Sequence, residues 1–388
     1  MSPVPGGFGA PPSRAQGGSP RAQGGRRRHR LARRHRLAGL VAALAVLALA
    51  GAGCGHPKKA ALRPTTTSSR AARKARATTT TRPARPVCPL TGAPPPGGGP
   101  VPQRAALAVK VENLPAARPQ WGLDKADVVF EEPVEGGITR FIAVYQCQDA
   151  SRIEPVRSGR LVDIAILKPL GMTLFAYAGA IQPVVNAVRA PGSLLEDVGP
   201  FVAPSAYERD PTRVAPHNLE TSTQALYRAA AQLHYTHALP KPLFSYGPPV
   251  MGGTPAAVVN LHFPLDVTTW TWVPKAKRWY RSYSDTGPAV QGDNVQVSAA
   301  NVVVLHVQEY ATPYVEDATG SHENELVLTG SGQAWVFRGG AQFYGKWERP
   351  SLSVPATFVE QDGAKVTLQP GNTWVELVPN GEAVTVTP

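Results

Sequence analysis

The residues best suited to chemistry gather around a Gly-Gly turn and a basic segment that follows it. The stretch EEPVEGGITRFIAVY, residues 131–145, places acids before Gly136-Gly137 and a Thr-Arg pair after it. The segment PVRSGR, residues 155–160, then brings two arginines to the predicted start of a helix. Guanidinium groups bind carboxylates and phosphates through two parallel hydrogen bonds, and unpaired N–H groups at a helix start also favour anions. Together the two segments predict an anion-binding site.

Three interpretations of these segments stay open. In the first, they line a pocket for an anionic envelope ligand, such as a peptidoglycan stem-peptide carboxylate or a teichoic or lipid phosphate. In the second, the acids pair with the arginines as a structural network. In the third, an envelope hydrolase or transferase uses Glu131 or Glu135 as acid/base and an arginine to stabilise charge. The candidate ligand-binding residues are Glu131, Glu135, Thr139, Arg140, Arg157, Ser158 and Arg160.

A second candidate group lies in the loop RDPTRVAPHNL, residues 209–219. His217 and Asn218 complete the list of ligand-binding candidates, since a His beside an Asn can act as a general base with an orienting partner. The alternative is that His217 caps the following helix or bonds a carbonyl. His234 and His237 lack a third ligand, so no metal is expected. No nucleotide or nucleophile-elbow motif occurs, so no cofactor and no catalytic residue are assigned.

The positive charge of the chain is confined to its beginning. The net charge is +13, but residues 1–87 hold 18 of the 40 Lys and Arg and none of the Asp or Glu. The remaining 22 Lys and Arg face all 27 Asp and Glu, so residues 88–388 carry a net charge of −5. Nucleic-acid binding is therefore not expected for the folded part, because such proteins present a basic surface to phosphates.

The beginning of the chain is similar to a bacterial lipoprotein signal. A basic segment at residues 26–36 precedes an apolar segment at residues 37–52, which is short for a membrane span. The sequence GAGCG then places Cys54 after small residues, although Gly51 stands where Leu is usual. The resemblance implies a signal peptide at residues 1–53, acylation of Cys54 by membrane lipid, palmitate included, and the outer face of the bacterial membrane. An uncleaved anchor or an ordinary secretory signal is the alternative.

Residues 54–87 are predicted to form a disordered basic tether, because their Thr, Pro, Ala and Arg residues lack apolar periodicity. Two cysteines follow, Cys88 and Cys147. An even pair in an exported protein favours a disulfide, and two separate small apolar residues are the alternative. Neither cysteine belongs to a CxxC motif, so a redox or Cys-based zinc site is not supported.

The pattern of elements predicts an α+β protein. A mixed α/β domain is expected at residues 88–250, with strands at 105–112 and 127–131 and helices at 158–170, 181–190 and 221–233. Gly136-Gly137 predicts a hairpin between arms 128–134 and 138–146, and Pro133 demotes the first arm to an edge or a bulge. A mostly antiparallel β domain is expected at residues 251–388. Its Trp-rich hairpin, residues 268–283, provides cross-strand partners or, alternatively, a carbohydrate platform.

From residue 89 onward the chain resembles the YerB-like lipoprotein family, whose two halves are known as domain of unknown function 3048, N- and C-terminal. The motifs that carry the resemblance are PLTG (89–92), ARPQWGLDKADVVFE (117–131), VEGGITRF (134–141), PVRSGR (155–160), APHNL (215–219), ANVVVLHV (300–307), GSGQAWVFRGG (330–340) and PGNTWVELVP (370–379). The family often has a His-Gly-Gly-Ser loop where this chain has YAGAIQP, residues 177–183. If that His takes part in chemistry, this protein lacks it.

The resemblance implies a bacterial envelope lipoprotein and no established activity. The sequence as a whole therefore predicts an extracytoplasmic, membrane-anchored lipoprotein that binds an anionic cell-wall or lipid ligand, or a protein partner. The enzyme interpretation stays as the alternative.

Overall fold

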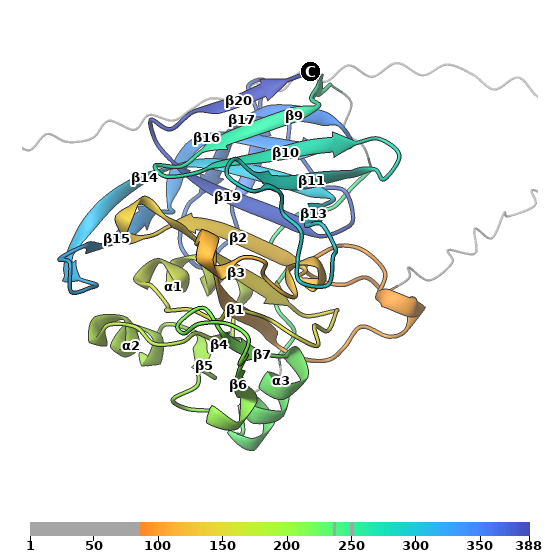
Figure 1. Cartoon of the computed structure of the whole chain (residues 1–388). Helices are drawn as coiled ribbons and strands as arrows, with labels where there is room; N and C mark the ends of the chain where they lie inside the picture. The colour runs from red at the N-terminus through yellow and green to blue at the C-terminus, as the bar shows by residue number, and fades with distance from the viewer. Residues whose placement is uncertain (1–85, 236–237, 249–251) are drawn as a thin grey trace, which may run out of the picture. The chain divides into compact units, whose positions relative to one another are not determined.

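The computed structural model describes residues 86–235, 238–248 and 252–388 (Figure 1). The predicted signal peptide, Cys54 and nearly all of the predicted tether lie outside these residues. Strands dominate the described part, and three short α-helices accompany them, so the predicted α+β class is confirmed. None of the helices in the described segments has the length and apolar character needed to span a membrane.

One large mixed sheet of twelve strands runs through the described chain. Its order is β18-β17-β16-β14-β19-β2-β3-β1-β4-β5, with β15 paired to β14 and β8 to β17. The bounds are β1 Ala106–Glu112, β2 Val128–Pro133, β3 Thr139–Tyr145, β4 Thr173–Ala176, β5 Leu195–Asp197, β8 Thr254–Pro255, β14 Asn301–Val315, β15 His322–Val327, β16 Gly330–Arg338, β17 Ala341–Arg349, β18 Thr357–Glu360 and β19 Thr373–Pro379.

Both halves of the sequence contribute to this sheet. Near the end of the chain, β19 pairs in parallel with β2, from Thr373 opposite Val128 to Glu376 opposite Glu131. The described residues accordingly belong to one compact unit. The predicted division at residue 250 thus separates two segments whose strands join in a single sheet.

A second sheet of six strands contains the Trp-rich hairpin. Its order is β12-β11-β10-β9-β20, with β13 paired to β11. Trp272 lies opposite Trp279, so the predicted hairpin contains an aromatic cross-strand pair, whereas Trp270 lies opposite Arg281. The bounds are β9 Val258–His262, β10 Val267–Val273, β11 Arg278–Tyr283, β12 Gly287–Pro288, β13 Ser298–Ala299 and β20 Val384–Thr387; a separate pair is β6 Tyr207–Arg209 and β7 Leu219–Thr221.

The three predicted helices are present with shorter bounds: α1 Leu161–Leu167, α2 Gln182–Arg189 and α3 Thr223–Gln232. Ser222 caps α3, because its hydroxyl accepts a hydrogen bond from the Ala225 N–H at 3.2 Å. Thr221, the residue before that cap, belongs to β7. Single 3-10 turns occupy Pro96–Gly98, Pro115–Ala117, Leu123–Lys125, Glu135–Gly137, Lys168–Leu170 and Pro204–Ala206.

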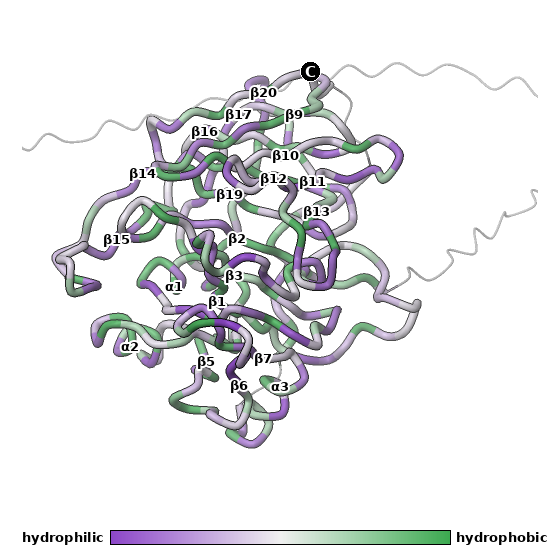
Figure 2. The backbone as a smooth tube through the Cα atoms, in the orientation of Figure 1, coloured by the Kyte–Doolittle hydropathy of each residue, from purple (hydrophilic) through white to green (hydrophobic). Residues whose placement is uncertain are grey.

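The large sheet is covered on both faces, since successive residues of a strand point to opposite sides. On one face, Ala108, Val128 and Ile142 pack with buried residues of α1 and α2. On the other face, Val109, Val129 and Phe141 pack with the second sheet and with α3. Figure 2 shows the hydrophobic stretches within the strands and hydrophilic stretches in many of the connections.

The Gly-Gly hairpin is confirmed, with φ of 72° at Gly136 and 75° at Gly137. A Cβ atom at Gly137 would lie only 3.1 Å from Pro264, so the turn also permits close approach of the β9–β10 connection. The prediction that Pro133 makes β2 an edge or bulged strand is wrong, because β2 lies between β19 and β3. Pro133 is tolerated there because pairing with β19 has already ended at Glu131.

Cys88 and Cys147 form a disulfide, so the predicted bond is present in the structure. It joins the beginning of the described chain to the residues just after β3 across a separation of 59 residues. Closing a loop of this length restricts the unfolded chain and stabilises the fold by about 4 kcal/mol in the chain-entropy description.

A buried ion cluster joins the two sheets. The Arg281 guanidinium lies 2.7 Å from Glu131 Oε2 and 3.2 Å from Glu376 Oε1, and all three side chains are buried. Burial alone would raise the pKa of Glu131, but the Arg281 charge and hydrogen bonds from Glu376 and Thr139 hold that pKa below its usual value. Burial and the Glu131 charge raise the pKa of Glu376 well above its usual value. We infer that Glu131 is the ionised partner and Glu376 the protonated one.

Because Glu131 is ionised and Glu376 is protonated, replacing each with Gln should change the free energy of unfolding by a different amount. Glu376→Gln should change the free energy of unfolding by less than about 1 kcal/mol, because Gln resembles a protonated Glu. Glu131→Gln should cost about 3–5 kcal/mol, because it leaves the Arg281 cation buried without its anion. Urea unfolding near pH 4.5 measures both values, because above that pH the parent must take up the Glu376 proton on folding, which Glu376→Gln does not. Equal losses for the two variants would show that the negative charge is shared between the carboxyls.

Candidate functional site

The candidate residues gather at one edge of the large sheet. β4 is parallel to β1, and β5 is parallel to β4. β2 also runs in the direction of β1, because both are antiparallel to β3. The carboxyl ends of these strands therefore share an edge, which is the position where open α/β sheets bind ligands. Glu112 ends β1, Asp197 ends β5, and Arg140 near the start of β3 is the Cα partner of Glu112.

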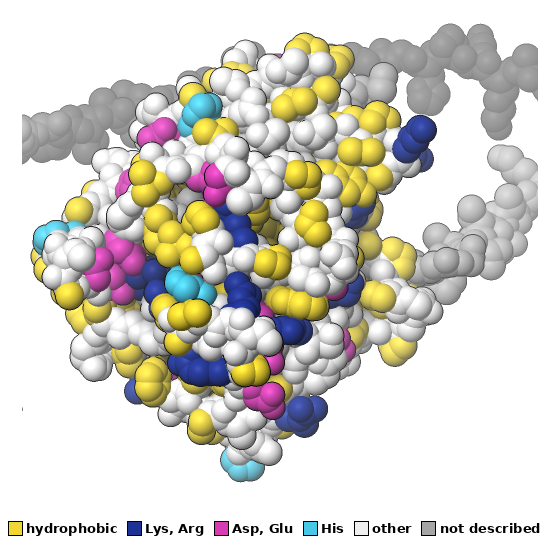
Figure 3. Space-filling model, viewed as in Figure 1, with side chains coloured by type: hydrophobic (Ala, Val, Ile, Leu, Met, Phe, Trp, Pro, Cys, Tyr) yellow, Lys and Arg dark blue, Asp and Glu magenta, His cyan; other side chains and the backbone are white. Residues whose placement is uncertain are grey.

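Glu112 holds two of the candidate side chains at this edge. Its Oε1 accepts a hydrogen bond from Arg157 Nε at 3.0 Å, and its Oε2 lies 2.8 Å from His217 Nδ1. The carboxylate is buried, whereas the side chains of Arg157 and His217 are 26% and 22% exposed. The three residues are called the Glu112 cluster below. Figure 3 shows Lys and Arg side chains gathered near the middle of the displayed face, with hydrophobic side chains among them.

The backbone positions Arg157 independently of its side chain. The Arg157 N–H donates to the Lys110 carbonyl at 2.9 Å, and the Arg157 carbonyl accepts from the Ala178 N–H at 2.8 Å. Segment 155–160 is thereby held between β1 and the residues that follow β4. Only the Arg157 Nε has a hydrogen-bonding partner among the described residues, and both terminal amino groups are available at the surface.

A second group, the Glu135 network, ties the hairpin to the beginning of α1. Glu135 lies between two arginines: its Oε1 accepts from Arg140 Nη2 at 3.0 Å and its Oε2 from Arg160 Nε at 2.7 Å. Arg160 Nη1 also lies 2.8 Å from Glu316, in the connection between β14 and β15. All these side chains are buried, which agrees with the structural interpretation of the arginines.

The pKa values in the Glu135 network argue against acid/base chemistry by Glu135. Burial would raise the pKa of Glu135, but Arg160 and Arg140 hold it below its usual value, so Glu135 stays ionised. Burial and the neighbouring Arg160 charge lower the pKa of Arg140 to about 10. Glu131, the other predicted acid/base candidate, lies on the opposite face of the sheet against Arg281.

The remaining candidates have supporting positions. Thr139 donates its hydroxyl hydrogen to Glu131 Oε1 at 2.6 Å. The Ser158 hydroxyl donates to the Ala178 carbonyl at 3.4 Å, a weak contact. The Asn218 side chain donates to the Asp210 carbonyl at 3.1 Å and accepts from Arg209 at 2.7 Å. Asn218 therefore braces its own loop, and the prediction that it orients His217 is wrong.

Glu112 is the site residue that sequence analysis missed. In the segment AVKVE, residues 108–112, nothing shows whether the Glu that ends the strand binds other side chains or simply faces solvent. The available signal was positional, because the acid ends a strand whose alternation places Lys110 and Glu112 on the same face. Its partners lie 45 and 105 residues away along the chain.

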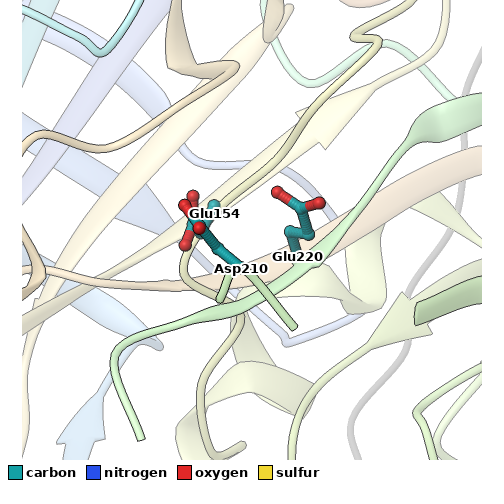
Figure 4. A group of neighbouring side chains, drawn as sticks. All are labelled: Glu154, Asp210 and Glu220. Atoms are coloured by element: carbon teal, nitrogen blue, oxygen red, sulfur yellow. The ribbon is translucent and has the colours of Figure 1, made fainter. Parts of the chain in front are cut away.

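Three acids lie close together near the β6–β7 pair: Glu154, Asp210 and Glu220 (Figure 4). Their ligand oxygens lie within 4.8 Å of one another, a spacing that a cation could bridge. Arg152 already supplies positive charge there, because its guanidinium nitrogens lie 2.7, 2.6 and 2.6 Å from the three carboxylates. The group is thus explained as an arginine-centred ion cluster without a metal.

Comparison with known proteins identifies the class. Residues 90–236 match the N-terminal domain, and residues 259–375 the C-terminal domain, of a family described as protein of unknown function DUF3048. These matches cover more than half of the chain, and the chain belongs to this family.

Two comparisons extend the identification. The chain is 26% identical over 291 residues to the "Putative lipoprotein YerB" of Bacillus subtilis (strain 168), over 74% of this chain and 85% of that protein. A crystal structure of YerB from Bacillus subtilis superposes with a TM-score of 0.67 at 24% identity, over 78% of this chain and 99% of that one. The chain therefore shares its fold with that solved structure.

Removal of Arg157 and removal of Arg160 should lower the free energy of unfolding by different amounts. Arg157→Ala should lower the free energy of unfolding by no more than about 1 kcal/mol, because its guanidinium is partly exposed. Arg160→Ala should cost about 3–5 kcal/mol, because it leaves Glu135 and Glu316 with fewer buried partners. Chemical denaturation of both variants tests this difference. A large loss for Arg157→Ala would assign that residue to the structural network as well.

Proposed function

We propose that the chain is a lipid-anchored, extracytoplasmic binding protein whose ligand presents an anionic group to Arg157. One observation carries this proposal: Arg157 is bound to Glu112 through Nε, while its two terminal amino groups stay available at the carboxyl edge of the sheet. A guanidinium in this position offers two donors to a carboxylate or a phosphate. The ligand class is an anionic cell-wall component or an anionic lipid headgroup.

Preorganisation supports the choice of Arg157 over the other arginines. A ligand that meets an already fixed side chain avoids much of the entropy cost of ordering it. Glu112 and the backbone contacts of Arg157 provide that fixation. Arg140 and Arg160 are instead buried and already bonded to Glu135, so a ligand would have to displace an internal carboxylate to reach them.

The location follows from three supporting features. The family relative in Bacillus subtilis is named a lipoprotein. Cys54 follows small residues at the end of an apolar segment, as acylation requires. The disulfide between Cys88 and Cys147 is of a kind that persists outside the cytoplasm. These features support our proposal that the protein lies on the outer face of the bacterial membrane, anchored through Cys54.

The test uses residues 79–388, whose described part forms one compact unit with its own core. The parent and Arg157→Ala are incubated with fractionated envelope material, and retained and released species are identified by mass spectrometry. We expect the parent to retain an anionic species and the variant to lose at least about 90% of it, since a charge-assisted contact contributes about 1.5–3 kcal/mol. Lys346→Ala is the control, because Lys346 is an exposed cation on β17.

The outcomes separate the interpretations. Equal retention by the parent and Arg157→Ala would contradict an anion site at this residue. Retention of a protein rather than a small anion, again lost in Arg157→Ala, would identify the Glu112 cluster as a contact for a protein partner.

A second candidate function, an envelope hydrolase or transferase, is favoured by one observation. His217 Nδ1 lies 2.8 Å from the buried Glu112 carboxylate, which leaves Nε2 available at the surface. A carboxylate that orients a His in this way prepares Nε2 to take a proton from an attacking water or hydroxyl. This geometry favours His217 as the base over Glu131 or Glu135. Fragments that accumulate with the parent but not with His217→Gln would establish turnover.

A further inference from the structure

A pocket lies at the ends of β4 and β5. Its volume is about 240 Å³, and it is lined by residues of the two strand ends, of α2 and of the connection after β5. The lining residues used below are Tyr177, Gly179, Arg189, Asp197, Gly199 and Phe201. No candidate from the sequence belongs to this group, although Tyr177 and Gly179 are part of the loop in which the chain departs from its family.

The pocket is connected to Arg157 through the backbone. The Ala178 N–H donates to the Arg157 carbonyl at 2.8 Å, and the Gly159 N–H donates to the Gly179 carbonyl at 3.0 Å. The segment that lines the pocket and the segment that carries Arg157 are therefore adjacent and bonded to each other. The ligand proposed below lies across both segments.

One side of the pocket carries a fixed polar group. Asp197 is buried, and its Oδ2 accepts hydrogen bonds from Tyr177 Oη at 3.1 Å and from Arg189 Nη2 at 2.9 Å. Its Oδ1 accepts from the Gly199 N–H at 2.9 Å. The Arg189 side chain is 53% exposed, so it retains donors for a ligand. The carboxylate thus orients an arginine, as Glu112 orients Arg157.

The other side carries an aromatic ring in solvent. Phe201 is 84% exposed, the highest value among the large hydrophobic residues of the described chain. Its Cε2 atom would lie 4.0 Å from a Cβ at Gly179, so the absence of a side chain there leaves space beside the ring. Of the hairpin aromatics considered as a carbohydrate platform from the sequence, Trp270 and Trp279 are completely buried, whereas Trp272 and Tyr280 are half-buried.

We propose that this pocket is a subsite for one sugar ring of an envelope glycan. An exposed aromatic face packs against the C–H groups of a pyranose, while Arg189, held by Asp197, bonds its hydroxyl or acetamido groups. The volume of about 240 Å³ lies below the roughly 300–1,000 Å³ typical of sites for drug-sized ligands, which suits a single ring. The inference rests on the proposed function, because the anionic substituent of the same sugar is assigned to Arg157.

Two sugars with the same ring test the subsite. N-acetylglucosamine is neutral, and N-acetylmuramic acid adds a carboxylate. Their affinities for residues 79–388 are measured by saturation-transfer NMR titration. We expect Phe201→Ala to weaken both sugars about three- to tenfold, because the stacking contact is lost. Arg157→Ala should weaken N-acetylmuramic acid alone.

Val214→Ala is the matched control, because Val214 is 80% exposed and does not line the pocket. Loss of binding in this variant equal to that in Phe201→Ala would overturn the assignment. The absence of binding of either sugar to the parent would also overturn it. Binding of anionic phospholipid vesicles that depends on Phe201, without sugar binding, would assign the ring to a membrane surface instead.

The results also separate this inference from the proposed function. If Arg157→Ala weakens N-acetylmuramic acid and Phe201→Ala changes neither sugar, the sugar subsite is wrong and the anion site stands. If Phe201→Ala weakens both sugars and Arg157→Ala changes neither, the anion site is wrong.

Discussion

Two consecutive buried acids on the central strand β2 constrain the whole structure. Because neighbouring residues of a strand point to opposite faces, Glu131 meets the second sheet and Glu132 meets α1. Glu131 shares the buried Arg281 with Glu376. Glu132 shares the buried Lys110 with Asp163, whose Oδ1 lies 2.6 Å from Lys110 Nζ. Burial and a neighbouring acid raise the pKa of Glu376 and of Glu132 well above their usual values. We infer that each cluster keeps one proton and is electrically neutral.

This arrangement separates structural charges from charges that can act on a ligand. Arginines and acids buried between the layers form their ion pairs inside the protein, and removing one partner strongly destabilises the fold. The Glu112 cluster lies at the carboxyl edge of the sheet, where Arg157 and His217 are partly exposed. A carboxylate that orients a cation thus stabilises the inside of the sheet, and the same arrangement at its edge is the one that we propose for ligand recognition.

Much of the fold could be predicted from local signals, and the site only in part. Gly136-Gly137, the Ser222 cap and the Trp272–Trp279 pair are encoded within a few residues, and the structure has all three. The pairing of β19 with β2 joins residues about 245 positions apart, which no local pattern reveals. For the same reason Arg157 and His217 could be proposed, whereas the residue that unites them, Glu112, could not.

The most direct test of the neutral clusters is the pH dependence of the free energy of unfolding. Unfolded Glu carboxyls ionise near their ordinary pKa of 4.5, while Glu132 and Glu376 would keep their protons when folded. Stability from these groups is therefore complete below that pKa and decreases as pH rises above it. Relative to the Glu132→Gln/Glu376→Gln variant, the parent should lose about 2.7 kcal/mol per pH unit toward neutral pH. Identical slopes would contradict the two retained protons.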